Sequence, residues 1–291
     1  MQKHPPLSTQ LSSMLRLMDD ESAEIQKILR DSILENALEI VVNKNRLYSG
    51  LEGGEIAIFN DFLQQLHSEL VYRAFGQLLS RSRDDVDLEA GVCIISYWYD
   101  RDVSCQSQQQ YLDRIAREIG HKLPEGVFGG VEMVGQLSNY LSSKESFRGN
   151  AADYYNPENS ILHRVLETRL GIPISLSAVY LLVAKRLGIP LLGVAMPGHF
   201  ILKYDDGGEE VFFDPYNGGR ISSRTHCLDM LNQLNTENPE QILRGCTHQE
   251  ILARMLRNLA IIYRSYANEE GKVAELERFL GLFGESKPEE R

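Results

Sequence analysis

The chain has 291 residues, of which 43% are hydrophobic and 24% are charged, and its formal net charge at pH 7 is -11. This length allows one large or two modest domains with a buried core that needs no metal or disulfide staple. The acidic balance argues against a protein that binds nucleic acid electrostatically, because such a protein needs a basic face. No stretch reaches the roughly 20 apolar residues that span a bilayer, and the N-terminus has no apolar run of signal-peptide length. We therefore expect a cytoplasmic protein with no cofactor, no metal, and neither nucleic acid nor membrane as a partner.

The first 145 residues predict an all-helical region. Apolar residues recur with the helical period over residues 8–42 and 56–79, and over two helices within 86–119 that a break near 100–106 separates. The stretch 43–54 is polar and contains three glycines, which predicts a loop. No internal repeat of sustained period is present.

The four cysteines predict no metal or redox site. Cys93, Cys105, Cys227 and Cys246 form no C-x-x-C pair. Cys93 lies in the apolar run 91–95, and we interpret it as a small buried hydrophobic residue.

The second half of the chain alternates helix and strand signals. Loop chemistry at 147–159 precedes a predicted helix at 160–170 with Ser160 as its N-cap. A helix from Ser175 to Leu187 is apolar almost all round, which indicates burial, and Gly188-Ile189-Pro190 ends it. The remaining predicted elements are strands at 191–196, 199–204 and 210–214, a hairpin turn at 205–208, and helices at 249–266 and 272–283.

Three of these elements predict a reactive constellation. Antiparallel pairing of a strand that begins at His199 with one that ends at Asp214 places the two side chains together. A carboxylate in that position orients an imidazole and stabilises its protonated form. The start of the buried helix would present Ser175 or Ser177 to the other ring nitrogen, with free helix N–H groups available for an oxyanion.

The motifs in this region resemble a known superfamily. Residues 150–222 are similar to the transglutaminase-like, papain-related core, and residues 85–283 as a whole are similar to its SirB-like branch. The similarity to the core is carried by Gly188-Ile189-Pro190, Pro197-Gly198-His199-Phe200 and Phe213-Asp214-Pro215-Tyr216, and the similarity to the branch by Phe147-Arg148-Gly149-Asn150, Tyr154-Tyr155-Asn156-Pro157, Asn159-Ser160 and Gly171-Ile172-Pro173-Ile174-Ser175-Leu176-Ser177.

The resemblance implies an α+β fold in three parts. It predicts a helical N-terminal region at 1–145, a transglutaminase-like core with a short antiparallel sheet at 146–247, and a tetratricopeptide-like helical hairpin with a tail at 248–291. Enzymes of this superfamily use a cysteine at the start of the buried helix, whereas this chain has Ser175 and Ser177 there, as is usual in the SirB-like branch. A serine hydroxyl needs base assistance and a good oxyanion hole, so the resemblance predicts the fold more firmly than an activity.

Each candidate residue also has a structural interpretation. Ser175 is a preferred N-cap type, Ser177 can hydrogen-bond to the backbone, and Asp214 can cap a turn before Pro215. Asn156, Asn159 and Ser160 either line a cleft or cap the next helix. The predicted cleft-lining residues are Tyr154, Tyr155, Asn156, Asn159, Pro197 and Gly198.

Two functional classes remain open at this stage. The missing cysteine and the tetratricopeptide-like hairpin favour a non-catalytic, regulatory module that binds a protein or peptide. The retained His199 and Asp214 favour a serine-dependent hydrolase or acyl transferase. A hydrogen bond between His199 and Ser175 or Ser177 would support the enzyme, and a serine bonded to the backbone would exclude it as the nucleophile. The oligomeric state is left open.

Overall fold

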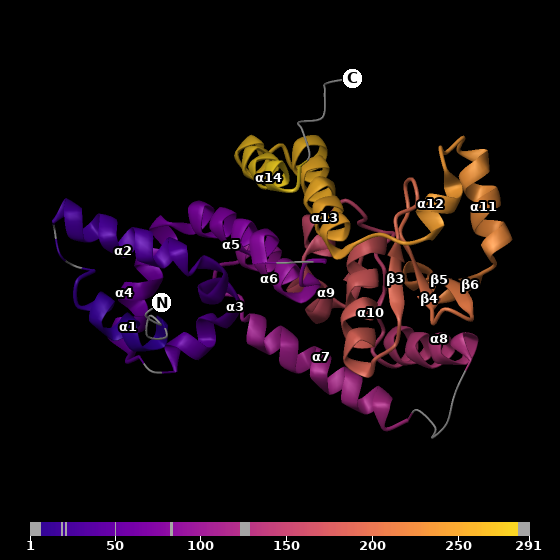
Figure 1. Ribbon diagram of the computed structural model, residues 1–291, viewed down its shortest axis with the longest axis horizontal. Helices are drawn as coiled ribbons and strands as arrows, with labels where there is room; N and C mark the ends of the chain where they lie inside the picture. The colour runs from indigo at the N-terminus through magenta and orange to yellow at the C-terminus, as the bar shows by residue number, and fades with distance from the viewer. Residues whose placement is uncertain are drawn as a thin grey trace.

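The computed structural model describes residues 7–18, 20, 22–49, 51–81, 84–122 and 129–284. Its N-terminal half is helical; Figure 1 shows the first five helices gathered at one end of the molecule and the eighth beneath the sheet at the other. The helices are α1 (Leu7–Leu15), α2 (Ala23–Glu35), α3 (Ala37–Tyr48), α4 (Gly53–Gln65), α5 (His67–Arg81), α6 (Leu88–Tyr99), α7 (Cys105–Gly120) and α8 (Gly130–Ser138), which a π-helical turn (Asn139–Lys144) extends.

The loop predicted at 43–54 is wrong over its first half. Helix α3 continues to Tyr48 through a kink at Asn43, where φ is -113° and ψ is 18°. Lys44 is buried in this segment, and its ammonium group donates to the backbone carbonyl of Arg101 and lies 5.4 Å from the centre of the Tyr97 ring. The polar composition predicts a loop, but here a charged residue is buried because distant groups pair with it. Those partners are far away in the sequence, so no local pattern reveals them.

The second half of the chain builds a small sheet between helices. Its elements are β1 (Arg148–Gly149), α9 (Leu162–Thr168), β2 (Leu170–Gly171), α10 (Pro173–Leu187), β3 (Leu191–Val194), β4 (Ile201–Asp205), β5 (Glu210–Asp214), β6 (Arg220–Ser222), α11 (Arg224–Gln233), α12 (Pro239–Leu243), α13 (His248–Ile262) and α14 (Glu270–Leu282). Strands β3 to β6 form an antiparallel sheet in chain order, and β1 pairs with β2 in parallel. The predicted α+β class is confirmed.

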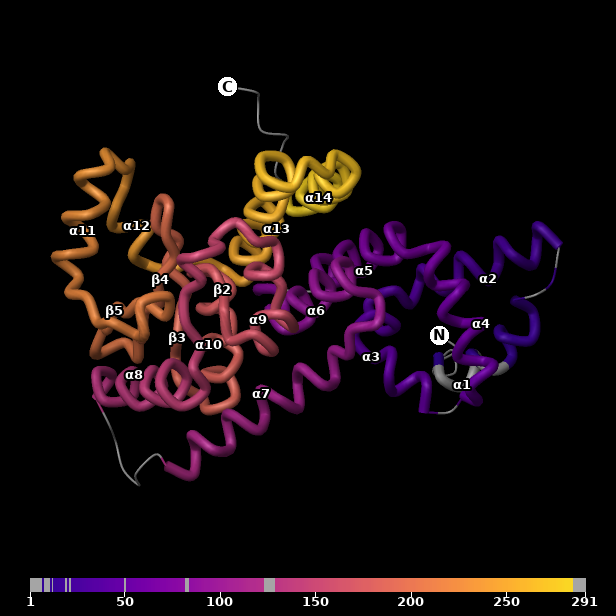
Figure 2. The backbone as a smooth tube through the Cα atoms, turned by 180° about the vertical axis from the view of Figure 1, so that it is seen from behind, coloured from indigo at the N-terminus to yellow at the C-terminus, as the bar shows by residue number. Residues whose placement is uncertain are grey.

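Helix α10 is the buried centre of this half. All its residues from Pro173 to Ala184 are buried, and it contacts α7, α9, α13, β3 and β4. Residues of β4 and β5 alternate between the two faces of the sheet, so Leu202 and Phe213 face the main core that contains α10. Ile201 and Phe212 face a second apolar cluster under α11 and α12. Helix α8 packs against β4 and β5 (Figure 2).

Two predictions in this half need correction. Strand β4 begins at Ile201 rather than at His199, because the backbone N–H of His199 is used in a turn and donates to the carbonyl of Met196. Helices α11 and α12 occupy a stretch between 214 and 249 for which the sequence predicts no element. The signals for α11 are local but weak: Ser223 caps it, and of its four apolar residues only Cys227 and Leu231, one turn apart, are buried.

The C-terminal helices close over the N-terminal ones. Phe279 and Phe283 each lie 5.7 Å from the ring of Phe75 on α5, and Trp98 Nε1 on α6 donates to Glu275 at 2.9 Å. One apolar core therefore runs through all three predicted parts, and their boundaries remain a prediction. Within the described ranges, the structure contains no helix that is both long and apolar enough to cross a bilayer.

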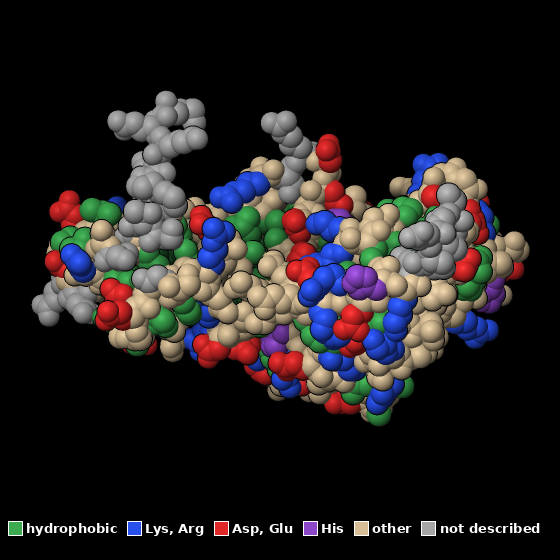
Figure 3. Space-filling view, turned by 90° about the horizontal axis from the view of Figure 1, so that it is seen from below, with side chains coloured by type: hydrophobic (Ala, Val, Ile, Leu, Met, Phe, Trp, Pro, Cys, Tyr) green, Lys and Arg blue, Asp and Glu red, His purple; other side chains and the backbone are tan. Residues whose placement is uncertain are grey.

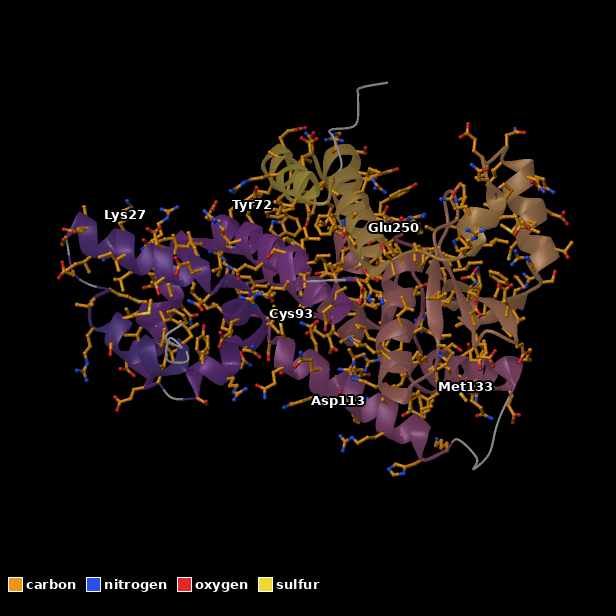
Figure 4. The ribbon with its side chains drawn as sticks, in the orientation of Figure 1. Lys27, Tyr72, Cys93, Asp113, Met133 and Glu250 are labelled. Atoms are coloured by element: carbon orange, nitrogen blue, oxygen red, sulfur yellow. A yellow bond between two sulfur atoms is a disulfide. The ribbon has the colours of Figure 1, made fainter. Side chains whose placement is uncertain are left out.

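Cys93 is buried, as predicted, but it is not only a small hydrophobic residue. Cys93 on α6 and Cys105 at the start of α7 form a disulfide, with their Cα atoms 5.7 Å apart. Figure 4 labels Cys93 within the helical region. No local pattern indicates this pair, because the two cysteines are 12 residues apart on different helices and meet only in the folded chain.

Thiol titration tests the disulfide. In denaturant without reductant, we expect two reactive thiols per chain, from Cys227 and Cys246, and four after reduction. Reduction should also lower the free energy of unfolding by about 3 kcal/mol, the magnitude typical of a short cross-linked loop. A Cys93→Ser/Cys105→Ser double variant should show two thiols under both conditions. Four thiols in the unreduced protein would exclude the bridge.

Candidate functional site

His199 is positioned by a tight turn and an arginine. Pro197 and Gly198 occupy the middle of the turn, and the φ of Gly198 is +68°, a value that favours glycine. The guanidinium of Arg254 on α13 donates to the carbonyls of Met196 at 2.9 Å and of His199 at 2.8 Å. The C-terminal helices therefore fix the backbone that carries the imidazole.

The structure brings His199 and Asp214 together, as the strand pairing predicts. Nε2 of His199 lies 2.7 Å from Oδ2 of Asp214. The carboxylate also accepts the backbone N–H of Tyr216 at 2.9 Å and the side-chain amide of Asn217 at 2.7 Å. Asp214 is thus both the partner of the histidine and the cap of the short 3₁₀ turn Pro215–Asn217. The functional and the structural interpretation of this residue are both compatible with the geometry.

The protonation state of Asp214 determines which nitrogen of His199 is available. Burial alone would raise the pKa of Asp214, but hydrogen bonds from His199 and Asn217 outweigh it and hold the pKa below its usual value. The ionised carboxylate only accepts, so Nε2 of His199 carries a proton and donates to it. Nδ1 is left without a hydrogen-bond partner within 129–284, and the side chain is 25% exposed.

Ser175 does not face the histidine. Its side chain is fully buried, and its hydroxyl donates to the carbonyl of Asn159 at 2.5 Å and accepts the backbone N–H of Ile172 at 3.1 Å. Ile172 is the N-cap of α10, and Ser175 is the N3 residue whose hydroxyl accepts the N–H of the N-cap. Ser175 therefore helps to cap this helix, but from three positions inside it. A Cβ added to Gly171 would lie 2.8 Å from the Ser175 hydroxyl, which shows how closely the group is enclosed. The backbone therefore occupies the hydroxyl that a nucleophile would need.

Ser177 and the free cysteines supply no nucleophile to the pair either. The hydroxyl of Ser177 is buried and makes no hydrogen bond within the described ranges, including to His199. Burial raises the pKa of Cys227 and raises that of Cys246 to about 12, so both thiols are protonated at neutral pH. No Ser/His/Asp or Cys/His/Asp triad is assembled among these residues.

The asparagines before α10 support the loop that leads to it. The buried Asn159 donates to the carbonyls of Asp153 at 2.6 Å and Tyr154 at 3.2 Å. Asn156 caps the 3₁₀ turn Pro157–Ser160 by accepting the N–H of Glu158. Ser160 belongs to this turn and is not the N-cap of α9, which is Ile161, so that prediction is wrong. The capping interpretation therefore holds for Asn156, whereas Asn159 binds carbonyls of the preceding loop.

A row of aromatic rings runs from His199 across this loop. Tyr216 meets the imidazole edge-on at 6.3 Å between ring centres, and Tyr154 lies 6.2 Å beyond it. Tyr155 follows at 5.2 Å and stacks on Tyr266 at 3.8 Å. We name Tyr216, Tyr154, Tyr155 and Tyr266 the tyrosine row. Its outer members are exposed, Tyr155 by 47% and Tyr266 by 55%.

Sequence reasoning missed several residues of this site. Arg254 and Tyr266 lie more than fifty residues from His199 in the chain, and no local pattern links them to it. Asn217 had a local signal, since it follows Asp214 within the same turn. Figure 3 shows acidic and basic side chains interspersed on the face it presents, in agreement with the absence of a basic sequence bias.

The pH dependence of stability tests the state of Asp214. Its lowered pKa means that the ionised group stabilises the fold above the unfolded value of about 3.9 and that this contribution is lost as the pH falls through the folded value. We expect Asp214→Asn to lower the free energy of unfolding by about 2 kcal/mol at neutral pH. The deficit should shrink on acidification in urea titrations.

The matched control for this measurement is Asp229→Asn, which replaces an exposed carboxylate on α11. Its effect on the free energy of unfolding should be small at every pH. A deficit of Asp214→Asn that stays constant on acidification would show that the carboxylate is not held ionised by its neighbours.

Comparison with known proteins places this geometry in a family. The transglutaminase-like superfamily model Transglut_core2 matches residues 106–257. A UPF0162 protein of Xylella fastidiosa is 43% identical over 135 residues, which cover 44% of this chain and 47% of that protein. A UPF0162 protein of Pseudomonas aeruginosa is 29% identical over 59% of this chain and 63% of its own length. F-box only protein 21 of Mus musculus is 34% identical over 44% of this chain and 21% of its own length.

The matched region therefore spans less than two thirds of each of these relatives. No solved structure shows a significant match. The family model covers just over half of the chain, including the His199–Asp214 pair and helix α10. The chain belongs to the transglutaminase-like superfamily.

Proposed function

We propose that this chain is a non-catalytic transglutaminase-like protein that binds a peptide segment of a protein partner at His199 and the tyrosine row. The observation that carries the proposal is the hydroxyl of Ser175, which is bonded to backbone groups of Asn159 and Ile172 instead of to the histidine. A His/Asp pair without a nucleophile can still donate and accept hydrogen bonds. This makes the pair suitable for holding a polar group of a peptide.

The tyrosine row supplies a surface of the kind that binds peptides. Exposed tyrosine rings offer a large apolar area with a polar end and few rotatable bonds, and aromatic-lined grooves recognise extended peptides. Tyr154 and Tyr155 lie in a loop whose backbone carbonyls accept hydrogen bonds from the side chain of the buried Asn159. Binding on such a prepared surface loses little conformational freedom.

A serine-dependent hydrolase or acyl transferase remains the alternative, favoured by the His199–Asp214 contact. It requires Ser177, whose hydroxyl is buried and has no partner in the described part of the chain, to become accessible to the imidazole. A regulatory role through a protein partner is compatible with the binding proposal. The names of the relatives do not specify a partner for this chain.

The finer family assignment is also part of the proposal. The SirB-like branch is supported by the sequence motifs around 147–177, and the tetratricopeptide-like character by two successive helices, α13 and α14, that pack against each other. The cytoplasmic location stays a prediction. The Cys93–Cys105 disulfide argues against it, because such bridges are rare in reducing compartments.

A phage-displayed library of random short peptides, selected on the intact protein, tests the binding proposal. We expect enriched peptides whose binding free energy weakens by at least about 1 kcal/mol in Tyr155→Ala and in Tyr266→Ala, since aromatic anchors dominate such interfaces. Leu234→Ala removes an exposed apolar side chain after α11 and should leave binding unchanged. Fluorescence anisotropy with the selected peptides gives the affinities.

Selected peptides that bind the tyrosine variants as well as the native protein would contradict the proposed surface. Covalent labelling of Ser177 or Ser175 by a fluorophosphonate probe, abolished in His199→Ala, would instead establish the hydrolase alternative. The two outcomes are separate because the first concerns the tyrosine row and the second the nucleophile.

A further inference from the structure

Arg254 on α13 is a half-buried cation next to His199 with donors to spare. Its Nη2 donates to the carbonyls of Met196 and His199, and these are its only hydrogen bonds within the described ranges. Nε and Nη1 therefore have no acceptor there, and they are not among the atoms that the fold closes off from solvent. The guanidinium holds the turn with one nitrogen and leaves the other two open to a ligand.

No carboxylate among the described residues neutralises this guanidinium. Burial lowers the pKa of Arg254, and the like charge of Arg257 lowers it further. The groups that favour its charged form are Cys246 and Tyr154, and neither is a carboxylate. An arginine stays charged in a protein even so. A partly desolvated charge without a counter-ion gains free energy when a ligand supplies one.

The neighbouring carboxylate of Asp214 is already fully engaged. Oδ2 lies 2.7 Å from Nε2 of His199 and accepts the side-chain amide of Asn217 at 2.7 Å. Oδ1 accepts the backbone N–H groups of Tyr216 at 2.9 Å and Asn217 at 3.3 Å. These four contacts use the acceptor capacity of the carboxylate, so it is not the counter-ion that Arg254 lacks.

Two tyrosine hydroxyls add neutral donors beside the guanidinium. The hydroxyls of Tyr154 and Tyr216 make no hydrogen bond in the described part of the chain, and neither is closed off from solvent. Burial raises the pKa of Tyr154, and the nearby charge of Arg254 opposes the increase. Burial and the charge of Asp214 raise the pKa of Tyr216. Both hydroxyls are therefore protonated at neutral pH and can donate to an acceptor on a ligand.

We propose that the peptide bound at His199 and the tyrosine row carries a carboxylate, which pairs with Arg254 and accepts the hydroxyl of Tyr154. This inference rests on the proposed peptide-binding function and specifies its ligand. A neutral carbonyl would leave the guanidinium without a counter-ion, and a cationic side chain would be repelled by it. The carboxylate belongs either to the C-terminus of the peptide or to an Asp or Glu side chain, which offer the same two oxygens.

The rest of the site suits the other groups of such a peptide. Nδ1 of His199 is an acceptor while Nε2 donates to Asp214, so it can accept a backbone N–H. Apolar side chains can pack on the exposed outer rings of Tyr155 and Tyr266. The net charge of -11 repels acidic peptides as a whole. A preference for a carboxylate therefore has to come from a local pairing.

Three libraries of bead-bound random hexapeptides without Asp or Glu at the random positions, incubated with the intact labelled protein, test the inference. The first library has one fixed Asp and an amidated C-terminus, the second has a free C-terminal carboxylate, and the third has neither. We expect the first or the second to retain the protein at least about tenfold more strongly than the third. Whichever of the two is retained identifies the source of the carboxylate.

Protein variants then locate the pairing. The best peptide is compared with its amide counterpart by fluorescence anisotropy, and the native preference for the acid should disappear in Arg254→Gln. Arg46→Gln makes the same change at an exposed position of α3 and should keep the preference. Tyr154→Phe removes only a hydroxyl and should reduce the preference by about threefold or more. This variant and the native comparison keep the test valid if Arg254→Gln does not fold.

Several results would overturn the inference. A merely structural Arg254 would weaken the acid and the amide by the same factor in Arg254→Gln, and the preference would survive. Equal retention by all three libraries would show peptide binding without a carboxylate, which removes this inference and leaves the peptide-binding function standing. Retention by none of the libraries would contradict both.

Discussion

The hydroxyl of Ser175 joins the start of α10 to the loop that precedes α9, and the geometry of the site depends on this junction. It bonds to the carbonyl of Asn159 and to the N–H of Ile172 inside a fully buried environment. The side chain of Asn159 in turn holds the loop that carries Tyr154 and Tyr155. A buried hydroxyl donates its single proton to one acceptor only, so this hydroxyl cannot act as a nucleophile while it is bonded to Asn159. The same interaction supports the loop that carries the aromatic surface.

Electrostatics keeps the other half of the site in place. Asp214 is stabilised as an anion by His199 and by the turn that it caps, and Arg254 holds the carbonyl next to the imidazole. Arg254 comes from α13, whose partner α14 packs on the N-terminal helices through Phe279 and Phe75. The geometry of His199 is thus linked to helices that are far from it in the sequence. The apolar core that runs through these helices provides this linkage.

The sequence predicts local features of this fold well and distant ones poorly. The contact between His199 and Asp214 follows from a Pro-Gly turn and a hairpin, and the burial of α10 follows from its apolar circumference, because both signals lie within short segments. Partners that only tertiary packing brings together carry no such signal. This is why the Cys93–Cys105 bridge, the burial of Lys44, and the roles of Arg254 and Tyr266 were missed. The predicted start of β4 lies two residues too early, because the N–H of His199 bonds within a turn and not within the sheet.

The most direct test of the account compares the unfolding free energies of Ser175→Ala and Ser177→Ala. The account assigns Ser175 a structural role, so its loss removes the hydroxyl's bonds to the carbonyl of Asn159 and the N–H of Ile172, which keep only their 3.3 Å bond to each other. It should lower the free energy of unfolding by about 1 kcal/mol. Ser177→Ala removes a buried hydroxyl that has no partner within the described ranges and should be neutral or stabilising. A neutral Ser175→Ala in urea titrations would contradict the claim that this hydroxyl is committed to the fold.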